Sequence, residues 1–314
     1  MAYTNTDTNM TTSSALSAGM QTYYNRELLR TFEPNLVHLQ FGDEHRMPPH
    51  SGLVMNMRKL IPLETNTKAL SEGDPGESVM LAETEVTVQL QQYGEYARCT
   101  DKLDLTHLDM DIMRRTKLFG DAGARSIDAV VREELAKCAN VIYAGGKASR
   151  AELTAADKLT SRELRKAVKT LKKNHAQTFG GYYVAIIGPD TMYDLQEDEA
   201  FVKVSQYQDK ENIYTGEVGR LFGVRLVETT EAKIFEGAGA SGADVASVIV
   251  LGQYAYGVTS LKGAKPRVIV KPAGSAGTAD PLDQISTVGW KMDGFGAKLL
   301  QPEYAVRIEC GFSE

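Results

Sequence analysis

The sequence predicts an α+β protein in which a long two-stranded ribbon projects from two mixed domains. Strand patterns with a period of two flank a polar turn between Ser51 and Arg98. A long helical pattern follows the ribbon. From Ala155 helices and strands then alternate, and β structure returns after Lys265. These three observations together predict an α+β class.

Length and composition agree with an ordered protein. The 314 residues suffice for about two domains, each with its own core. Lys and Arg number 35 against 41 Asp and Glu, a net charge of −6, which excludes a strongly basic protein whose main ligand is a phosphate backbone. The sequence has no apolar run long enough for a transmembrane helix and no signal-peptide pattern at its start. Three widely spaced cysteines indicate reduced thiols in the cytoplasm.

The segment before the ribbon carries few apolar residues. The first 15 residues bury too little apolar area to order alone, so we expect them to be mobile in a free subunit. Apolar spacing from Leu16 to Phe32 predicts a short amphipathic helix that ends before Pro34.

The ribbon between Ser51 and Arg98 is the most informative stretch. In its two arms apolar residues alternate with polar ones: Leu53, Met55 and Met57 in the first, Val86, Val88 and Leu90 in the second. Arms of about 15–20 residues would reach about 50–65 Å. A lone two-stranded ribbon is marginally stable in water, so we hypothesise that another subunit covers its apolar row. The alternative is a hairpin folded back on its own domain.

Two helices are predicted after the ribbon. The first ends at Gly120, and the second begins at Asp121 and ends at Gly145. The apolar positions of the first are Leu105, Leu108, Ile112 and Phe119, and those of the second are Ile127, Val131, Leu135, Cys138 and Ile142. On such a face Cys138 is predicted to be a small buried residue and not a reactive thiol.

A capping box, Thr160 with Glu163, opens the helical part of the α/β segment. Helices are predicted at Ser161–Asn174 and from Pro189, and strands at Tyr182–Ile187, Gly223–Glu228, Ser247–Leu251, Arg267–Lys271, Ile285–Met292 and Tyr304–Ile308. The first helix carries a basic face of six residues: Arg162, Arg165, Lys166, Lys169, Lys172 and Lys173. We interpret this face as solvated and not as a nucleic-acid patch, because no aromatic residues lie between the charges.

No catalytic, cofactor or metal motif stands out. His45 and His50 are separated by two prolines and have no cysteine nearby, which favours a turn over a zinc site. Gly237–Gly242 matches a dinucleotide-binding glycine pattern, but the apolar run after it predicts a strand where that pattern requires a helix. The glycines therefore predict a connection between strands. A nucleotide-dependent enzyme is disfavoured, and a monomeric binding module stays an alternative.

Several segments, taken in order, resemble the major capsid proteins of tailed bacteriophages. The strongest are Glu217–Thr229, Val250–Val258 and Asp280–Lys291. Tyr23–Arg26, Leu70–Pro75 and Gln92–Gly94 are similar upstream, so the resemblance runs from about residue 20 to the end. It implies the Hong Kong 97-type capsid fold.

That resemblance implies a division of the chain into four parts. Residues 1–50 would form an N-terminal arm and residues 51–103 an extended loop. Residues 104–154 and 265–314 would form a discontinuous peripheral domain with a spine helix at about 121–143, and residues 155–264 would form the axial domain. An arm of this length would leave no room for the scaffolding segment that some members carry.

The function implied is that of a structural subunit, not an enzyme, which assembles with itself into an icosahedral shell around double-stranded DNA. The virion would be its location, after assembly in the host cytoplasm, and no cofactor or membrane would be involved. Further partners implied are a portal protein and scaffolding, protease and cement proteins. Contacts between subunits are predicted at Lys68, Glu72, Gly73, Asp74 and Glu77 in the loop tip and at Val86, Val88 and Leu90 in its second arm. Lys68 has no assigned cross-linking role, and an encapsulin-like compartment of the same fold is the alternative.

Overall fold

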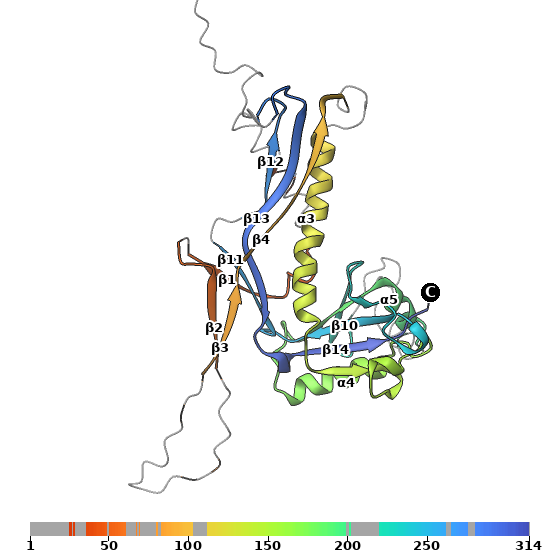
Figure 1. The fold of residues 1–314 in the computed structure, drawn as a ribbon. Coiled ribbons are helices and arrows are strands. Elements are labelled where there is room, and N and C mark those ends of the chain that lie inside the picture. The colour runs from red at the N-terminus through yellow and green to blue at the C-terminus, as the bar shows by residue number, and fades with distance from the viewer. Residues whose placement is uncertain are drawn as a thin grey trace, which may run out of the picture.

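The computed structural model describes residues 36–48, 50–60, 83–102, 112–198, 220–261, 265–275 and 280–313, with isolated positions at 25, 26, 28, 67, 69, 80 and 201. Within these residues the strands form a five-stranded sheet, a seven-stranded sheet and a two-stranded ribbon. The five-stranded sheet runs along the long helix α3, the seven-stranded sheet lies at one end of that helix, and the ribbon projects from the side (Figure 1). The predicted α+β class is confirmed.

The five-stranded sheet is built on one long strand, β13 (Ile285–Leu299). β4 (Gln91–Thr100) pairs antiparallel along one side of β13. Along the other side lie β12 (Arg267–Lys271) and β11 (Tyr256–Leu261), and β1 (Asp43–Met47) joins β11 in parallel. β12 has the predicted bounds.

β13 continues beyond the end that the sequence predicts at Met292. Its register with β4 shifts between Met292 and Phe295, and Gly294 in between has a φ of 69°. A bulge of this kind bends a strand without ending its pairing. The strand therefore reaches β12 with its first half and β11 with its second.

Helix α3 (Ile112–Leu135) packs one face against the five-stranded sheet. Ile127, Val131 and Leu135 are fully buried in the core that also holds Trp290 and Phe295. This face was expected from the sequence, but both predicted ends of the spine helix are corrected. The helix passes through Gly120, which is buried there, so that close packing offsets the cost of about 1 kcal/mol that glycine carries in a helix.

The second end of the predicted spine helix belongs to a strand. β5 (Val141–Tyr143) pairs in parallel with β14 (Ala305–Cys310), so Ile142 does not lie on α3. Cys138 is buried in the connection, as predicted, and donates to the carbonyl of Ala305 at 3.0 Å. Cys99 and Cys310 are likewise free and buried.

The seven-stranded sheet has α4 (Ser161–Lys173) on one side and the end of α3 on the other. Every residue of its strands β6 (Tyr183–Ile187) and β10 (Val245–Leu251) is buried, because both faces of the sheet are covered. The order of strands is β5-β14-β10-β6-β8-β7, with β9 (Ile234–Phe235) also on β10. The remaining elements are α5 (Pro189–Gln196), β7 (Arg220–Leu221), β8 (Val224–Glu228) and the short 3₁₀ turns Ala144–Gly146, Arg150–Glu152, Ala240–Gly242 and Pro302–Tyr304.

Two strands depart from the predicted division of the chain. β14, in the part predicted as peripheral, pairs with β10 in the seven-stranded sheet. β11, in the part predicted as axial, pairs with β13 in the five-stranded sheet. Strand pairing decides membership, and its partners lie far away in the sequence, so each sheet takes a strand from across the predicted boundary.

The capping box differs in geometry from the prediction. The Thr160 hydroxyl donates to the Glu163 carboxylate and does not cap a backbone N–H. Asp198 caps the helix instead, because its carboxylate accepts from the Ser161 N–H at 2.7 Å. Gly237–Gly242 joins β9 to β10, which confirms that a strand follows the glycines.

A buried hydrogen-bonded pair fixes the segment before β1. The Asp128 carboxylate on α3 accepts from the His38 backbone N–H at 2.7 Å and lies 2.5 Å from His38 Nδ1. The Tyr256 hydroxyl donates to the His38 carbonyl. Residues 1–24 lie outside the described part of the chain, so the expected mobile start is not tested; the part of the predicted arm that is described supplies β1 to the five-stranded sheet.

Candidate assembly interface

The described part of the ribbon is one short antiparallel pair of strands. β2 (Val54–Leu60) pairs with β3 (Glu83–Gln89) over seven residues each, in the register Met55↔Val88 and Met57↔Val86. Beyond Leu90 the chain enters β4 and belongs to the five-stranded sheet. The described pairing spans about 23 Å, and the predicted second arm divides after Gln89, because its second half pairs with β13.

The apolar row of the ribbon packs on its own subunit. Val88 and Leu90 are 2% and 3% exposed in the single chain, and Met57 is buried as well. Glycines make the room: a Cβ at Gly257 would lie 2.8 Å from the Met57 sulfur, and one at Gly296 would lie 2.9 Å from a Val88 methyl. For Met57, Val88 and Leu90 the expectation that another subunit covers the row is therefore wrong, and this part of the hairpin follows the alternative that the sequence left open.

Two ion pairs lie at the end of the paired strands that is next to the loop tip. Lys59 Nζ lies 2.8 Å from Glu303 Oε2, so β2 is tied to the turn between β13 and β14. The hydrogen bond from Lys59 outweighs partial burial and lowers the pKa of Glu303. Across the ribbon, Arg58 and Glu83 face each other at 3.5 Å. These contacts fix the direction in which the ribbon leaves the subunit.

The predicted contact residues of the loop tip lie outside the described residues: Lys68, Glu72, Gly73, Asp74 and Glu77. Of the predicted second-arm residues, only Val86 is half-buried, since Val88 and Leu90 are buried. Large apolar side chains remain exposed near the ribbon at Leu53 (61%), Val54 and Met80. The sequence placed Leu53 in the apolar row of the first arm, whereas Val54 and Met80 were not singled out.

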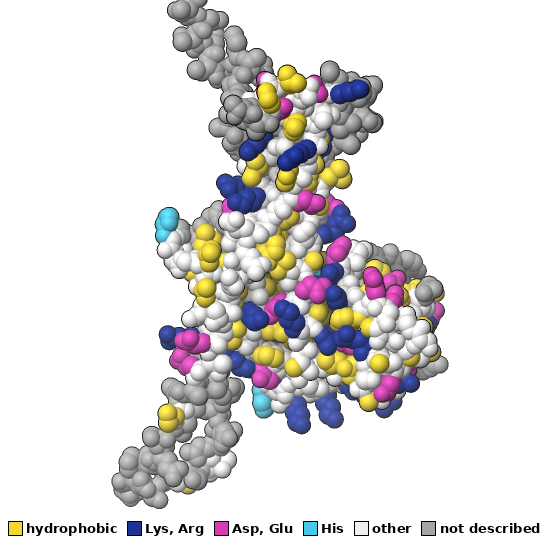
Figure 2. Space-filling model, viewed as in Figure 1, with side chains coloured by type: hydrophobic (Ala, Val, Ile, Leu, Met, Phe, Trp, Pro, Cys, Tyr) yellow, Lys and Arg dark blue, Asp and Glu magenta, His cyan; other side chains and the backbone are white. Residues whose placement is uncertain are grey.

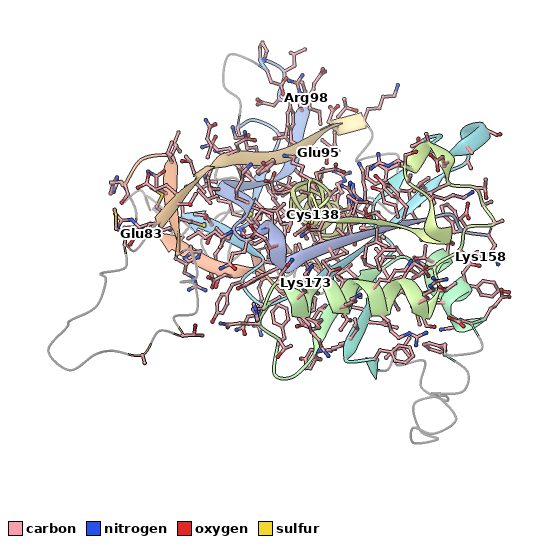
Figure 3. The ribbon with its side chains drawn as sticks, turned by 90° about the horizontal axis from the view of Figure 1, so that it is seen from below. Glu83, Glu95, Arg98, Cys138, Lys158 and Lys173 are labelled. Carbon is pink, nitrogen blue, oxygen red and sulfur yellow. The ribbon has the colours of Figure 1, made fainter. Side chains whose placement is uncertain are left out.

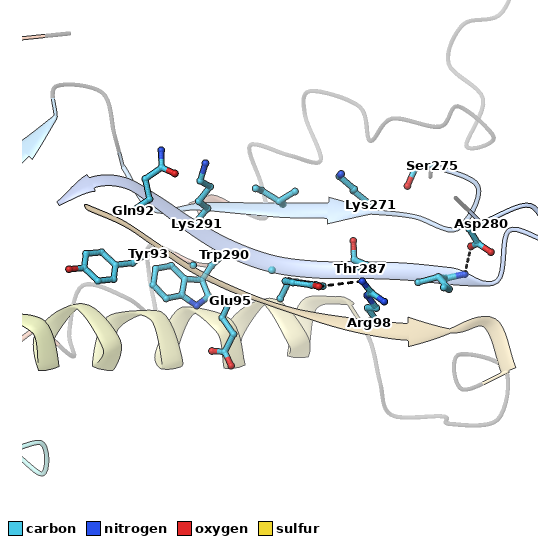
Figure 4. Close-up of a pocket in the computed structure, with 15 residues that line it drawn as sticks. Gln92, Tyr93, Glu95, Arg98, Lys271, Ser275, Asp280, Thr287, Trp290 and Lys291 are labelled. Carbon is cyan, nitrogen blue, oxygen red and sulfur yellow. Dashed lines mark hydrogen bonds between the residues drawn. The ribbon is translucent and has the colours of Figure 1, made fainter. Parts of the chain in front are cut away.

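A hollow of about 630 Å³ lies on the face of the five-stranded sheet that points away from α3 (Figure 4). Lys271 and Lys291 stand on this face, while Trp290 and Glu95 point toward α3. The register explains the alternation: Thr287, Gly289 and Lys291 face the hollow because Val288, Trp290 and Met292 are buried on the other side.

Two glycines form the floor of this hollow. A Cβ at Gly289 would lie 2.6 Å from the Glu95 carbonyl oxygen, and one at Gly94 would lie 2.7 Å from the Trp290 carbonyl oxygen. Only glycine fits between β4 and β13 at these points. Tyr96, which is 62% exposed, and Ile269 flank the floor and give the hollow apolar walls.

The rim of the hollow is mainly basic. The Arg98 guanidinium lies 5.7 Å from the centre of the Tyr96 ring, and Lys291 Nζ lies 2.8 Å from Asp293. Among the described residues no carboxylate pairs with Arg98 or Lys271. The lining acids are Glu95 and Asp280, and Asp280 accepts from the Ile285 N–H. In Figure 2 basic and hydrophobic side chains lie interspersed over this sheet.

Metal-binding side chains and cysteine thiols would be further candidates for a site in the described residues. These residues contain no group of three or more His, Cys, Asp or Glu side chains that could hold a metal ion. Burial raises the pKa of both Cys138 and Cys310, which keeps these thiols protonated. No described helix is both long and apolar enough to cross a membrane. The surfaces that remain to be explained are the ribbon and the hollow, and both suit contact with another protein.

Comparison with known families decides between the remaining classes. A family model described as phage capsid protein matches residues 83–308, well over half of the chain. The chain belongs to the phage capsid protein family. It is a structural subunit of a capsid, and its place is in the virion. A comparison with curated proteins finds no match.

Solved capsids share the fold of this capsid protein. The capsid of Ralstonia phage GP4 is 15% identical and superposes with a TM-score of 0.68, over 100% of this chain and 98% of that one. The capsid of cyanophage P-SCSP1u is 16% identical, with a TM-score of 0.67 over 88% and 89% of the two chains. A virus-like particle from Pyrococcus furiosus is 12% identical, with a TM-score of 0.54 over 92% and 99%. The fold is the Hong Kong 97-type capsid fold.

Proposed function

We propose that this capsid protein assembles with itself into the icosahedral head of a tailed phage, around the double-stranded DNA genome. The family match over residues 83–308 carries the proposal, because it covers α3, the second strand of the ribbon and every strand of the two sheets except β1 and the end of β14. Assembly takes place in the host cytoplasm. A portal protein is a further partner, and scaffolding, protease and cement proteins are candidates. The subunit itself has a structural role and catalyses no reaction.

The contact between subunits joins the loop tip of one copy to the hollow of the next. The tip carries three acids, Glu72, Asp74 and Glu77, and the hollow carries Arg98 and Lys271 without a described carboxylate partner. Opposite charge on the two surfaces supports this pairing. Lys68 and Gly73 belong to the same tip and share the contact.

Apolar contacts supply the strength of this interface. Exposed ion pairs contribute only about 0–1 kcal/mol each, so they set the register of the contact more than its affinity. Tyr96 and Ile269 in the hollow, and Leu53, Val54 and Met80 near the ribbon, offer apolar area that the single chain leaves open. Val88 and Leu90 anchor the ribbon to its own subunit instead.

Charge reversal tests the proposed contact. Lys271→Glu with Arg98→Glu, or Glu72→Lys with Glu77→Lys, is expected to prevent shells from forming when each pair is changed alone. Combining both pairs restores opposite charges and is expected to restore shells seen by electron microscopy. Lys117→Glu, an exposed lysine on α3 outside the hollow, is the control and keeps the shells. If each double variant alone formed shells as the wild type does, the proposed contact would be contradicted.

Protease protection gives an independent check. Cleavage between Glu72 and Glu77 is expected to slow in assembled particles, because the tip is then covered by the neighbour. The reference is the cleavage rate at the same site in dissociated subunits of the same protein. Equal rates in the two states would contradict a covered tip.

A second candidate is a compartment of the same fold that encloses protein, as in an encapsulin-like shell. The structural similarity to the virus-like particle from Pyrococcus furiosus, over 92% of this chain, supports this second candidate. Nucleic-acid content separates the two functions. Particles purified from infected cells are expected to contain double-stranded DNA, and particles filled with protein and free of DNA would favour the second candidate.

A further inference from the structure

The exposed face of α4 carries a dense array of positive charge. Six basic residues lie on this 13-residue helix, and Glu163, its one acid, is buried. Leu164, Ala167, Val168 and Leu171 pack into the core on the opposite side. Figure 3 shows α4 on the outside of the molecule, with Lys173 near one end. The six basic residues, which we call the α4 stripe, are Arg162, Arg165, Lys166, Lys169, Lys172 and Lys173.

The α4 stripe is an array of like charges on neighbouring turns of the helix. Lys169 lies four residues from Arg165 and from Lys173, and three from Lys166 and from Lys172. Like charges at these spacings destabilise a helix, whereas exposed helices commonly alternate acids with bases. The helix therefore carries a repulsion that its own folding does not require.

The described residues do little to neutralise this array. Lys166 lies 3.6 Å from Glu163, and Arg165 lies over the ring of Phe222 at 5.0 Å. Among the described residues, no carboxylate lies within ion-pair distance of Arg162, Lys169 or the two last-turn lysines. The last turn gains from the helix dipole, which accounts for Lys172 and Lys173 but not for the rest.

General basicity does not explain the α4 stripe. The helix carries a charge of +5 while the whole chain carries −6, so positive charge is concentrated on one face of an acidic protein. From Arg162 to Lys173 the stripe extends about 16 Å, since a helix rises 1.5 Å per residue. Double-stranded DNA carries one negative charge per about 1.7 Å of its axis, so a rod of phosphates matches this length and charge.

We propose that the α4 stripe binds the phosphate backbone of double-stranded DNA. The inference rests on the proposed function of a shell around DNA, and it places the exposed face of α4 toward the interior of that shell. The interaction reads no sequence, because lysine and arginine on one helix face meet phosphates and not base edges. This proposal takes the alternative to the solvated face that the sequence favoured, and Phe222, whose ring lies 5.0 Å from the Arg165 guanidinium, is an aromatic neighbour from another segment.

The salt dependence of DNA binding tests the proposal. Full-length dissociated subunits are titrated with a 30-base-pair duplex of mixed sequence between about 50 and 200 mM salt, and binding is followed by fluorescence anisotropy. Each phosphate that a lysine neutralises adds about 0.9 to the magnitude of the slope of log K against log salt. Lys169→Gln, Lys172→Gln and Lys173→Gln together remove three such lysines and are expected to reduce that magnitude by about 2.7.

The matched control changes three exposed lysines elsewhere, Lys117→Gln, Lys147→Gln and Lys265→Gln, and is expected to leave the slope unchanged. Both triple variants are expected to form shells, so weakened DNA binding is distinguishable from failure to assemble. An equal reduction of the slope in the control, or an unchanged slope in the α4 variant, would overturn the proposal. So would competition by polyglutamate as strong as that by DNA, which would indicate an acidic protein as the partner.

Discussion

Replacing Asp128 with alanine is expected to destabilise the subunit by about 4 kcal/mol. The Asp128 carboxylate is fully buried and accepts from the His38 backbone N–H at 2.7 Å, while its second oxygen lies 2.5 Å from His38 Nδ1. The pair joins α3 to a residue 90 positions earlier in the chain. Removing the carboxylate therefore releases the segment before β1 from the spine helix.

The magnitude follows from the two groups that the substitution leaves unpaired. Each buried polar group without a partner costs about 1–3 kcal/mol, and both belong to His38, which is 1% exposed. Two such groups give about 2–6 kcal/mol, in agreement with the 3–5 kcal/mol typical of a broken buried pair. Asp128→Asn keeps the shape and the acceptor for the backbone N–H, so it should lose about half as much.

Urea unfolding of dissociated subunits, followed by circular dichroism, measures this loss as a change in the free energy of unfolding. Asp121→Ala on the same helix is the control, because its partner Arg125 is exposed and such pairs contribute at most about 1 kcal/mol. A loss for Asp128→Ala no larger than that of the control would refute the reasoning, since it would mean that water or another group satisfies His38.

Three further outcomes follow from the structure. Burial raises the pKa of Asp194, but hydrogen bonds from Ser313 and Lys158 outweigh it and hold that pKa below its ordinary value. The ionised carboxylate therefore stabilises the folded state at neutral pH. The difference in unfolding free energy between wild type and Asp194→Asn should shrink as the pH falls below about 4. Gly289→Val should cost about 1–3 kcal/mol or more, measured by thermal unfolding, because even a Cβ would lie 2.6 Å from a backbone oxygen of β4. Val88→Ala should lower the unfolding free energy by about 1–3 kcal/mol, whereas Val54→Ala, at an exposed site, should change it by less than about 0.5 kcal/mol and instead raise the subunit concentration needed for assembly.

Local patterns in the sequence predict the elements well. Alternation at Met55, Met57 and Val88 predicts two strands with one apolar face, and the structure pairs them in that register. Apolar spacing likewise predicts the face that α3 buries. These features depend on neighbours within a few residues, so a single sequence contains them.

The residues that cover those faces could not be predicted from local patterns. The row of Val88 fits its own subunit because Gly257 and Gly296 leave room, and these glycines lie on β11 and β13, far along the chain. A glycine that admits a distant side chain looks the same in a sequence as a glycine in a turn. For this reason the sequence predicted an uncovered ribbon, although the apolar face itself was right.

The hollow escaped prediction for a related reason. Tyr96, Ile269 and Gly289 come from three strands, and each alone is an ordinary strand residue. The register Ile269↔Gly289↔Tyr96 alone brings them side by side. The only signal in the sequence was the family resemblance, which implied a neighbour for the loop but not the residues that receive it.

The proposed contact at the loop tip would gain from the anchored strands of the ribbon. Binding through a mobile loop costs the entropy of ordering it, and that cost is lower when the loop leaves a fixed base in a set direction. Buried Met57 and Val88, and the pair Lys59–Glu303, fix the base of the ribbon before any neighbour arrives. Each subunit also meets several neighbours at once, and simultaneous engagement multiplies weak affinities. Burial of Met57, Val88 and Leu90 within the subunit therefore favours the proposed assembly, although it removes these three side chains from the interface.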